Sequence, residues 1–355
     1  MSIKRTWLIA LVAVLVTIGV VESPAAFAAV STVVFTPGSR AAGATSSWDV
    51  NFTPSNGTTG ELKAGDKITV TFNSLFTVST TPVVTLPGGF TGNCTTSVTK
   101  PSAAVVLIAL AGSTCDLKNA SGTVRIDGIT NPAAGTYLGS SFSVLTTKDT
   151  AGSSNSPIVI DPGAPAKLAF AQGPGNGFAG TALSPAITVQ VQDQFGTATG
   201  ASGIAVSLAS SPAGIDAGAT ATTNASGLAT FTGVVINKAT IGLTITATAP
   251  SLVSAVSAPF NITVAVSSGA VLSGSADDGT GSGVKSVAYY YCAGYSGSCT
   301  SANWTLIGSS TSAAASYQVT WTATPAAGAY RVVASSIDNV TNTSQPSTTT
   351  PVTVS

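Results

Sequence analysis

Residue types that commonly do chemistry are scarce in this chain. It has 355 residues and no histidine, which excludes Ser-His-Asp and Cys-His catalysis. Glu61 is the one glutamate that follows the N-terminal leader, and the aspartates are widely spaced. Asp277 and Asp278 are adjacent, and neighbours in an extended chain point to opposite sides, so they do not form a ready acid/base pair. We therefore predict a protein that is not an enzyme.

Calcium is the metal that these carboxylates would suit best. Asp277 and Asp278 lie near the start of the last segment and Asp338 lies near its end, and strand ends of one sandwich can meet. Calcium needs about six or more oxygen ligands, however, and this spacing matches no known calcium loop. Aspartate also holds turns through its side chain. We predict no metal and no cofactor, with a calcium site at these three residues as the minor alternative.

The four cysteines predict two disulfides if the chain is exported. Four cysteines allow three pairings, and the simplest joins sequence neighbours, Cys94 with Cys115 and Cys292 with Cys299. Free buried thiols are the alternative. Paired cysteines would leave zinc without good ligands.

The N-terminus has the pattern of an export signal. Lys4 and Arg5 precede an apolar run, Trp7 to Val21, and Ala26-Phe27-Ala28 follows as a small-x-small cleavage pattern. The alternative is an uncleaved anchor, but the run is shorter than the roughly 20 residues that a spanning helix needs. We predict a signal peptide over residues 1–28 with cleavage after Ala28, a secreted, extracellular or cell-surface protein, and no membrane span after removal of the signal.

Charge is rare and balanced, at 7% of residues with 13 basic and 13 acidic side chains. Removal of the leader takes away Lys4, Arg5 and Glu22, which leaves 11 basic and 12 acidic residues. Such a chain has no field to attract nucleic acid or an anionic membrane. We predict no nucleic-acid partner.

Hydrophobic residues alternate with polar ones along most of the chain. In AITVQVQD, residues Ile187, Val189 and Val191 share one face, and the segments KITVTF and GLTITAT have the same period. Turn residues interrupt this pattern about every eight to twelve residues. The pattern predicts an all-β protein of sandwiches or barrels.

Two turn-rich breaks divide the chain that follows the leader. Asp149 to Ala166 is the first break and Ala265 to Ala270 is the second. We predict three tandem β-sandwich domains, over residues 29–160, 161–265 and 266–355, because each segment has the usual size of one sandwich. We call them the first, middle and C-terminal segments.

The middle segment carries a family resemblance. AKLAFAQGPGNGFAGTALSPAITVQVQDQFGTAT, TTNASGLATFTGVVI and GLTITATAPSL resemble a bacterial immunoglobulin-like repeat of the invasin and intimin kind over residues 166–264. The C-terminal segment, with GAVLSGSADDGTGSGVKSVAYYY and YRVVASSIDNVTN, resembles another bacterial surface immunoglobulin-like module, and the first segment is similar to modules of large exported surface proteins. The resemblance implies spacers, stalks and adhesins, and it carries no catalytic set.

The stretch YYYCAGYSGSC, Tyr289 to Cys299, predicts a strand that runs into a disulfide-closed loop. Alternation places Tyr289 and Tyr291 on one face and Tyr290 on the other, so one of these sets is outside. We expect most aromatic residues here to be core, with Trp304 beside Leu306, and Tyr317 beside Trp321. Tyr290 and Tyr295, the latter at the loop tip, are the candidate ligand contacts.

These observations predict an exported, monomeric, non-enzymatic protein that acts in adhesion, interaction or spacing through immunoglobulin-like modules. Its partner would be a host or cell-wall protein or glycan of unidentified kind. The alternative is a carbohydrate-binding protein that uses the exposed aromatic residues of the C-terminal segment.

Overall fold

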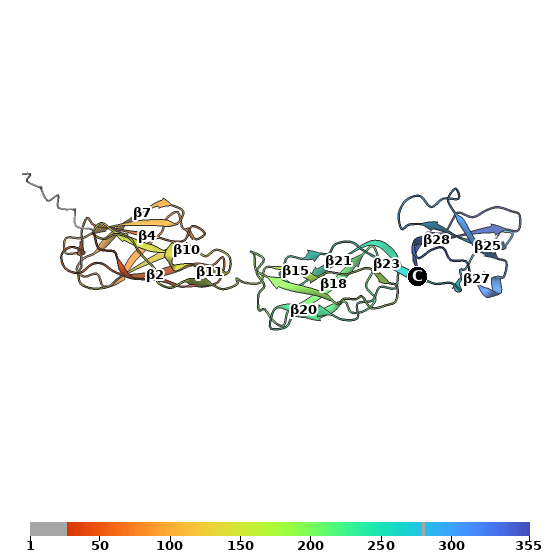
Figure 1. Ribbon diagram of the computed structural model, residues 1–355, viewed down its shortest axis with the longest axis horizontal. Coiled ribbons are helices and arrows are strands. Elements are labelled where there is room, and N and C mark those ends of the chain that lie inside the picture. Colours follow the sequence, from red (N-terminus) through yellow and green to blue (C-terminus); the bar gives the residue numbers. More distant parts are fainter. Residues whose placement is uncertain (1–26, 279–280) are drawn as a thin grey trace, which may run out of the picture. The chain divides into compact units, whose positions relative to one another are not determined.

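The computed structural model describes residues 27–278 and 281–355. Of the predicted signal peptide, only Phe27 and Ala28 are among these residues, so the signal itself lies outside the described part of the chain. The described residues are all-β (Figure 1), as the alternating pattern predicts, and the helices among them are two short 3₁₀ turns, η1 (Gly139–Ser141) and η2 (Ala313–Ala315).

The chain forms two compact units. The described part of the first unit comprises residues 27–39, 45–130 and 136–158, and the second unit comprises residues 40–44, 131–135 and 159–355. The second unit therefore includes both the middle and the C-terminal segments, together with two short stretches that the sequence analysis placed in the first segment. The division into three domains at residues 160 and 265 stays a prediction.

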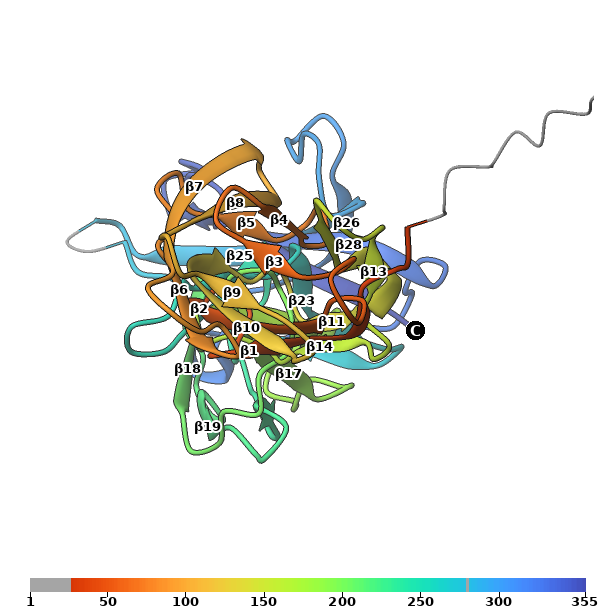
Figure 2. The same ribbon diagram turned by 90° about the vertical axis from the view of Figure 1, so that its left-hand side faces the viewer.

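Two five-stranded antiparallel sheets form the first unit. Figure 2 shows β7, β8 and β4 above β2, β10 and β1. One sheet contains β1 (Ser31–Pro37), β2 (Thr45–Thr53), β10 (Gly122–Thr130), β5 (Thr77–Val78) and β6 (Val84–Gly88). The other contains β13 (Gly152–Ser153), β12 (Ser143–Thr146), β4 (Lys67–Thr71), β8 (Val105–Ala111) and β7 (Thr95–Ser102). The short strands β3 (Leu62–Lys63) and β9 (Asp116–Leu117) pair with each other, and β11 (Gly135–Tyr137) and β14 (Ile158–Ile160) are also short.

An aromatic cluster fills the space between these sheets. Trp48 of β2 meets Phe72 and Phe76 edge to face, with ring centroids 5.6 and 5.4 Å apart. Phe142, next to β12, contacts Phe72 and Phe76 as well. Edge-to-face contacts of this kind stabilise a core beyond the apolar area that they bury.

A smaller sheet and part of a larger one enclose the core of the middle segment. The smaller sheet contains β15 (Lys167–Gln172), β17 (Ile187–Gln192) and β20 (Leu228–Phe231). The larger sheet begins with β19 (Thr220–Thr222), β18 (Ala205–Ser211), β21 (Thr240–Thr248) and β23 (Phe260–Val266), to which β22 (Ala255–Val256) and β16 (Gly177–Phe178) add. Ile187, Val189 and Val191 are fully buried, and the residues between them are half-buried, as period two predicts.

The larger sheet continues into the C-terminal segment through β23. The last three residues of β23 run parallel to β29 (Thr350–Val354), which is followed by β28 (Gly328–Asp338), β25 (Val284–Ala293) and β26 (Thr305–Ser310). The predicted boundary after residue 265 therefore falls inside a strand, because β23 pairs both with β21 of the middle segment and with β29 of the C-terminal segment in the same sheet.

The C-terminal segment buries its core under a two-stranded sheet. β24 (Ala270–Leu272) pairs with β27 (Val319–Trp321), and Trp321 packs against Val266, Val332 and Val352 of the larger sheet. Val287, Tyr289 and Tyr317 form a second small cluster. These cores are separate from the larger cluster of the middle segment.

Candidate functional site

The alternation of β25 divides the three consecutive tyrosines between two faces of the sheet. Tyr289 is 4% exposed and belongs to the core. Tyr291 is also on the inner side, where its ring stacks on Trp321 with centroids 5.4 Å apart. Tyr290 lies on the other, outer face and is half-buried. The structure thus decides which of the two faces that carry tyrosine is interior.

Tyr290 forms a stacked pair with Trp304 on this outer face. The ring centroids are 4.7 Å apart and the rings are inclined by 27°. Leu306, directly opposite Tyr290 in the neighbouring strand, is 58% exposed. Trp304 is half-buried on the outer face and is an exception to the expectation that most of these aromatic residues are core, because β26 directs Ile307, not Leu306, toward the inner clusters.

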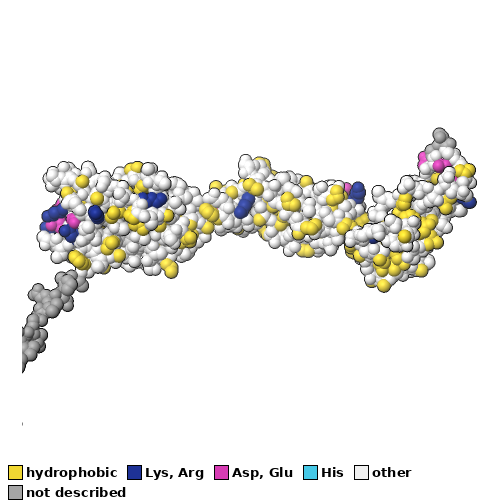
Figure 3. All heavy atoms as spheres, turned by 90° about the horizontal axis from the view of Figure 1, so that it is seen from above, with side chains coloured by type: hydrophobic (Ala, Val, Ile, Leu, Met, Phe, Trp, Pro, Cys, Tyr) yellow, Lys and Arg dark blue, Asp and Glu magenta, His cyan; other side chains and the backbone are white. Residues whose placement is uncertain are grey.

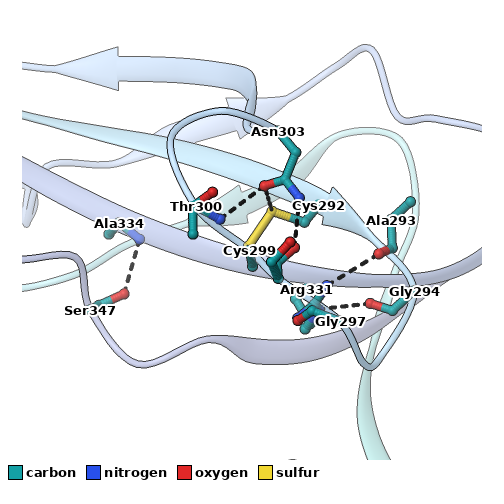
Figure 4. Close-up of a disulfide and its surroundings, with 11 residues drawn as sticks. Cys292, Ala293, Gly294, Gly297, Cys299, Thr300, Asn303, Arg331, Ala334 and Ser347 are labelled. Atoms are coloured by element: carbon teal, nitrogen blue, oxygen red, sulfur yellow. Dashed lines mark hydrogen bonds between the residues drawn. A yellow bond between two sulfur atoms is a disulfide. The ribbon is translucent and has the colours of Figure 1, made fainter.

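The loop after β25 is closed by a disulfide between Cys292 and Cys299 (Figure 4). Asn303 holds the far side of this loop: its amide nitrogen donates to the carbonyl of Ser298, and its oxygen accepts from the backbone N–H of Thr300. Gly294 and Gly297 both have positive φ, at 76° and 90°, which glycine adopts without strain. The turn chemistry and the disulfide together fix the loop against the sheet.

Arg331 of β28 supports the same loop from the sheet. Its guanidinium donates to the carbonyls of Gly294, Gly297 and Ala293 at 2.9, 2.7 and 3.3 Å (Figure 4). The residue is only 7% exposed. A planar guanidinium can serve several acceptors at once, so this one cation replaces its lost hydration with three backbone carbonyls.

Tyr295 is the second candidate ligand contact. It is half-buried, and its hydroxyl forms a hydrogen bond with the Thr353 hydroxyl on β29. The side chain of Tyr295 therefore contacts the sheet and does not project from the loop tip. The Tyr290–Trp304 pair, in contrast, presents ring surface on the outer face. The structure does not bring Tyr290 and Tyr295 into direct contact through any interaction among its described residues.

Two of the three candidate calcium residues, Asp278 and Asp338, hold turns. An oxygen of Asp278 accepts from the backbone N–H of Gly283, and Asp338 accepts from the N–H groups of Val340 and Asn342. Burial opposes ionisation of Asp338, but these hydrogen bonds bring its pKa below the usual value. Among residues 27–278 and 281–355, no three Asp, Glu, Cys or His side chains come together as a metal site.

Two more acidic groups also have structural partners. Asp193 is fully buried and accepts backbone N–H groups of Gly163, Phe195 and Thr197, which closes the turn after β17. Burial raises the pKa of Asp193, but the hydrogen bonds outweigh burial and lower it. Glu61 pairs with Lys63 and Lys118 at 2.9 and 3.3 Å. Charged side chains elsewhere are few and form small separate groups on the face seen in Figure 3.

The second disulfide lies in the first unit. Cys94 and Cys115 are joined, so both locally paired disulfides are present and no described cysteine is free. Cys94 directly precedes β7, and the bond fixes that end of the sheet to the turn before β9. None of the helices in the described residues is long and apolar enough to cross a membrane.

The described residues form an all-β chain of packed sheets. Its sequence matches no protein-family model and no curated protein. Similar solved structures include invasin, a bacterial integrin-binding protein (15% identity, 85% of this chain and 56% of that chain, TM-score 0.26). A putative membrane-anchored protein of Corynebacterium diphtheriae covers 91% of both chains at 12% identity and a TM-score of 0.27.

Another similar structure is the adhesin InvE of Yersinia pseudotuberculosis, at 17% identity and a TM-score of 0.23. The match covers 66% of this chain and 58% of that adhesin, so this chain spans a little over half of its length. These are likenesses in fold, and the function is argued from the chain's own residues.

Sequence reasoning did not assign a role to Arg331 or place Trp304 on the outer face. A lone arginine in the apolar run AYRVVAS is a detectable signal, because a strand residue of that kind needs a partner that satisfies it. No sequence pattern predicts that Trp304 lies on the outer face. The path of the loop of residues 294–304 sets which face of the sheet Trp304 occupies.

Proposed function

We propose that this chain is an exported, non-enzymatic protein of the cell surface or the extracellular space, where serial immunoglobulin-like sandwiches space and present an interaction face. The observation that carries the proposal is the way the outer face of the C-terminal segment is built. A disulfide, the three bonds of Arg331 and the Tyr290–Trp304 stack fix a loop and an aromatic pair on a rigid sheet. Rigid presentation lowers the entropy cost of binding a partner.

The use of the acidic side chains supports the non-enzymatic part of the proposal. Asp193, Asp278 and Asp338 hold turns, and Asp49 and Glu61 pair with cations. A hydrolase of polysaccharides would need a carboxyl pair that faces a cleft. These five groups serve the fold instead.

The disulfides support export. Each disulfide joins two cysteines that are close in the sequence, and no described cysteine is left unpaired. Full pairing of cysteines is typical of proteins that fold in an oxidising compartment. The predicted signal peptide, with cleavage after Ala28, supplies the route.

Fractionation of the producing cells tests this proposal. We expect the chain in the medium or in the cell-surface fraction, with Ala29 as its first residue and with both disulfides formed. Protease added to intact cells should degrade it. A chain that keeps its leader, stays in the cytosol and has reduced thiols would contradict the proposal. A pull-down with the chain from Ala29 as bait would then identify the partner.

Carbohydrate binding is the second candidate, and the Tyr290–Trp304 pair favours it. Aromatic rings on an exposed sheet face can stack on sugar rings. The test is binding of the wild-type chain and of a Tyr290→Ala, Trp304→Ala variant to insoluble cell-wall polysaccharides. Equal retention of the two proteins would dismiss this candidate, and loss of retention in the variant would support it.

A further inference from the structure

A groove of about 480 Å³ opens on the flank of the C-terminal segment. Its walls come from the end of β23, from β24 and the residues after it, and from β25, β28 and β29. Val266, Val332 and Val352 form its apolar floor, and Val271, which is 56% exposed, stands at its rim. The volume is within the usual range of small-molecule sites, about 300 to 1,000 Å³.

Tyr289 lines this groove, and its hydroxyl is buried without a hydrogen-bond partner among the described residues. The residue as a whole is 4% exposed. A methyl group placed on Gly274, another lining residue, would lie 3.2 Å from that oxygen. Buried hydroxyl groups nearly always have a hydrogen-bond partner, so this one stands out.

The protonation state of Tyr289 makes it a donor. Burial raises the pKa of its hydroxyl above the ordinary value, so the proton stays on the oxygen at neutral pH. A protonated hydroxyl that has no partner can donate this proton to an acceptor on a ligand.

The lining of the groove contains no charged side chain; its remaining polar groups are hydroxyls of serine and threonine, such as Ser273, Ser347 and Thr350. A charged ligand would lose hydration in this groove and gain no opposite charge. The lining therefore selects against ions and favours a neutral molecule that covers the valine floor.

We propose that this groove binds a small, uncharged, mostly apolar molecule with one hydrogen-bond acceptor, to which the Tyr289 hydroxyl donates. This role is independent of the outer face, because the groove faces the inner side of β25 and the Tyr290–Trp304 pair lies on the opposite side. The occupant is a small molecule and not another protein segment, since the hollow matches a small-molecule site in volume.

A fluorescence titration tests the proposal with Nile red, a neutral apolar dye that carries a carbonyl acceptor. We expect saturable binding to the chain from Ala29, and displacement by 1-octanol but not by octanoate at equal concentration. Absence of saturable binding by both Nile red and 1-octanol would overturn the proposal. Equal displacement by octanol and octanoate would overturn it as well, because it would show that the site does not select against charge.

Two variants locate the binding site. Tyr289→Phe should weaken binding by roughly threefold to tenfold, which is the worth of one net hydrogen bond. Its thermal midpoint should not fall, because the hydroxyl has no partner to lose in the part of the chain that the structure describes. Tyr317→Phe is the matched control, since Tyr317 belongs to the same core cluster but does not line the groove. Equal affinity of the Tyr289→Phe and Tyr317→Phe variants would overturn the role of Tyr289.

Val271→Lys should abolish binding, because it places a charge at the rim of the groove. Val256→Lys is the control: Val256 is a similarly exposed valine, 63% against 56%, on β22 of the middle segment. If the Val271→Lys and Val256→Lys variants bind Nile red with equal affinity, the dye binds elsewhere and the proposal is overturned. Both positions are exposed, so neither variant should unfold the chain.

Discussion

The Arg331 guanidinium donates a hydrogen bond of 2.7 Å to the carbonyl oxygen of Gly297, which lies 34 residues earlier in the sequence. This hydrogen bond connects strand β28 to the loop that contains Gly297. Two further bonds, to Gly294 and Ala293, come from the same side chain. Among the described residues, no carboxylate pairs with this arginine, so the loop carbonyls are its main compensation. The loop and the arginine therefore stabilise each other, and the disulfide between Cys292 and Cys299 closes the same loop.

Arg331→Met should loosen this loop. Hydrogen bonds to a charged group contribute about 1.5–3 kcal/mol, so we expect the free energy of unfolding of the C-terminal segment to fall by about that amount. Hydrogen exchange of residues 293–299, followed by mass spectrometry, measures the local effect. Arg125→Met is the control, because Arg125 pairs with Asp49 on the surface and such pairs contribute about 0–1 kcal/mol. Unchanged exchange in Arg331→Met would contradict the role of the arginine.

Removal of the two disulfides should have unequal effects. In the chain-entropy model, replacement of Cys94 and Cys115 by alanine should cost about 3 kcal/mol. Replacement of Cys292 and Cys299 should cost about 2.5 kcal/mol, because that bond closes a shorter loop, of separation 7 against 21. Denaturant unfolding of each double variant measures the difference. A larger loss for the shorter loop would show that contacts such as those of Arg331 depend on the disulfide.

The Tyr290–Trp304 stack should be a measurable coupling. Aromatic pairs contribute about 0.5–1.5 kcal/mol beyond the area that they bury. A double-mutant cycle with Tyr290→Ala, Trp304→Ala and the double variant should return a coupling energy in that range. A coupling near zero would mean that the rings touch without stabilising each other, and the aromatic face would then not be rigid.

Asp193 should make the stability of the middle segment depend on acid. Its folded pKa is lowered, so its contribution is complete above the ordinary pKa of an aspartate, about 3.9, and is lost as the pH falls through the folded value. Stability of the wild-type chain should therefore fall between about pH 5 and pH 2. Asp193→Asn should be less stable at pH 7 and should show a shallower decline. Parallel pH curves for the two proteins, from denaturant unfolding, would refute this assignment.

Packing in the middle segment offers a fifth measure of the fold. Phe231 of β20 is 1% exposed and belongs to the cluster that contains Ile187 and Val189. Phe231→Ala should lower the free energy of unfolding by about 3–5 kcal/mol, because a buried phenylalanine leaves a cavity. Thr230→Ala, at the neighbouring exposed position, should change it by less than about 0.5 kcal/mol. A small effect of Phe231→Ala in the same denaturation experiment would mean that the sheets can close over the cavity.

The alternation of hydrophobic and polar side chains in the sequence is sufficient to predict the all-β fold. Ile187, Val189 and Val191 had to share a buried face, because successive side chains of a strand point to opposite sides. The local cysteine pairing was the simplest of the three that four cysteines allow, and the structure has it. Both inferences depend on neighbours in the sequence, which is why they could be made from the sequence alone.

Only the tertiary structure decided which side of β25 faces the core. Both faces of that strand carry tyrosine, so alternation left the choice between Tyr290 and its two neighbours open. The answer came from β27, which supplies Trp321 to the inner side, and from the loop that returns Trp304 to the outer side. The role of Arg331 and the pairing of β23 with β29 were set in the same way, by contacts between residues far apart in the chain, which no local pattern encodes.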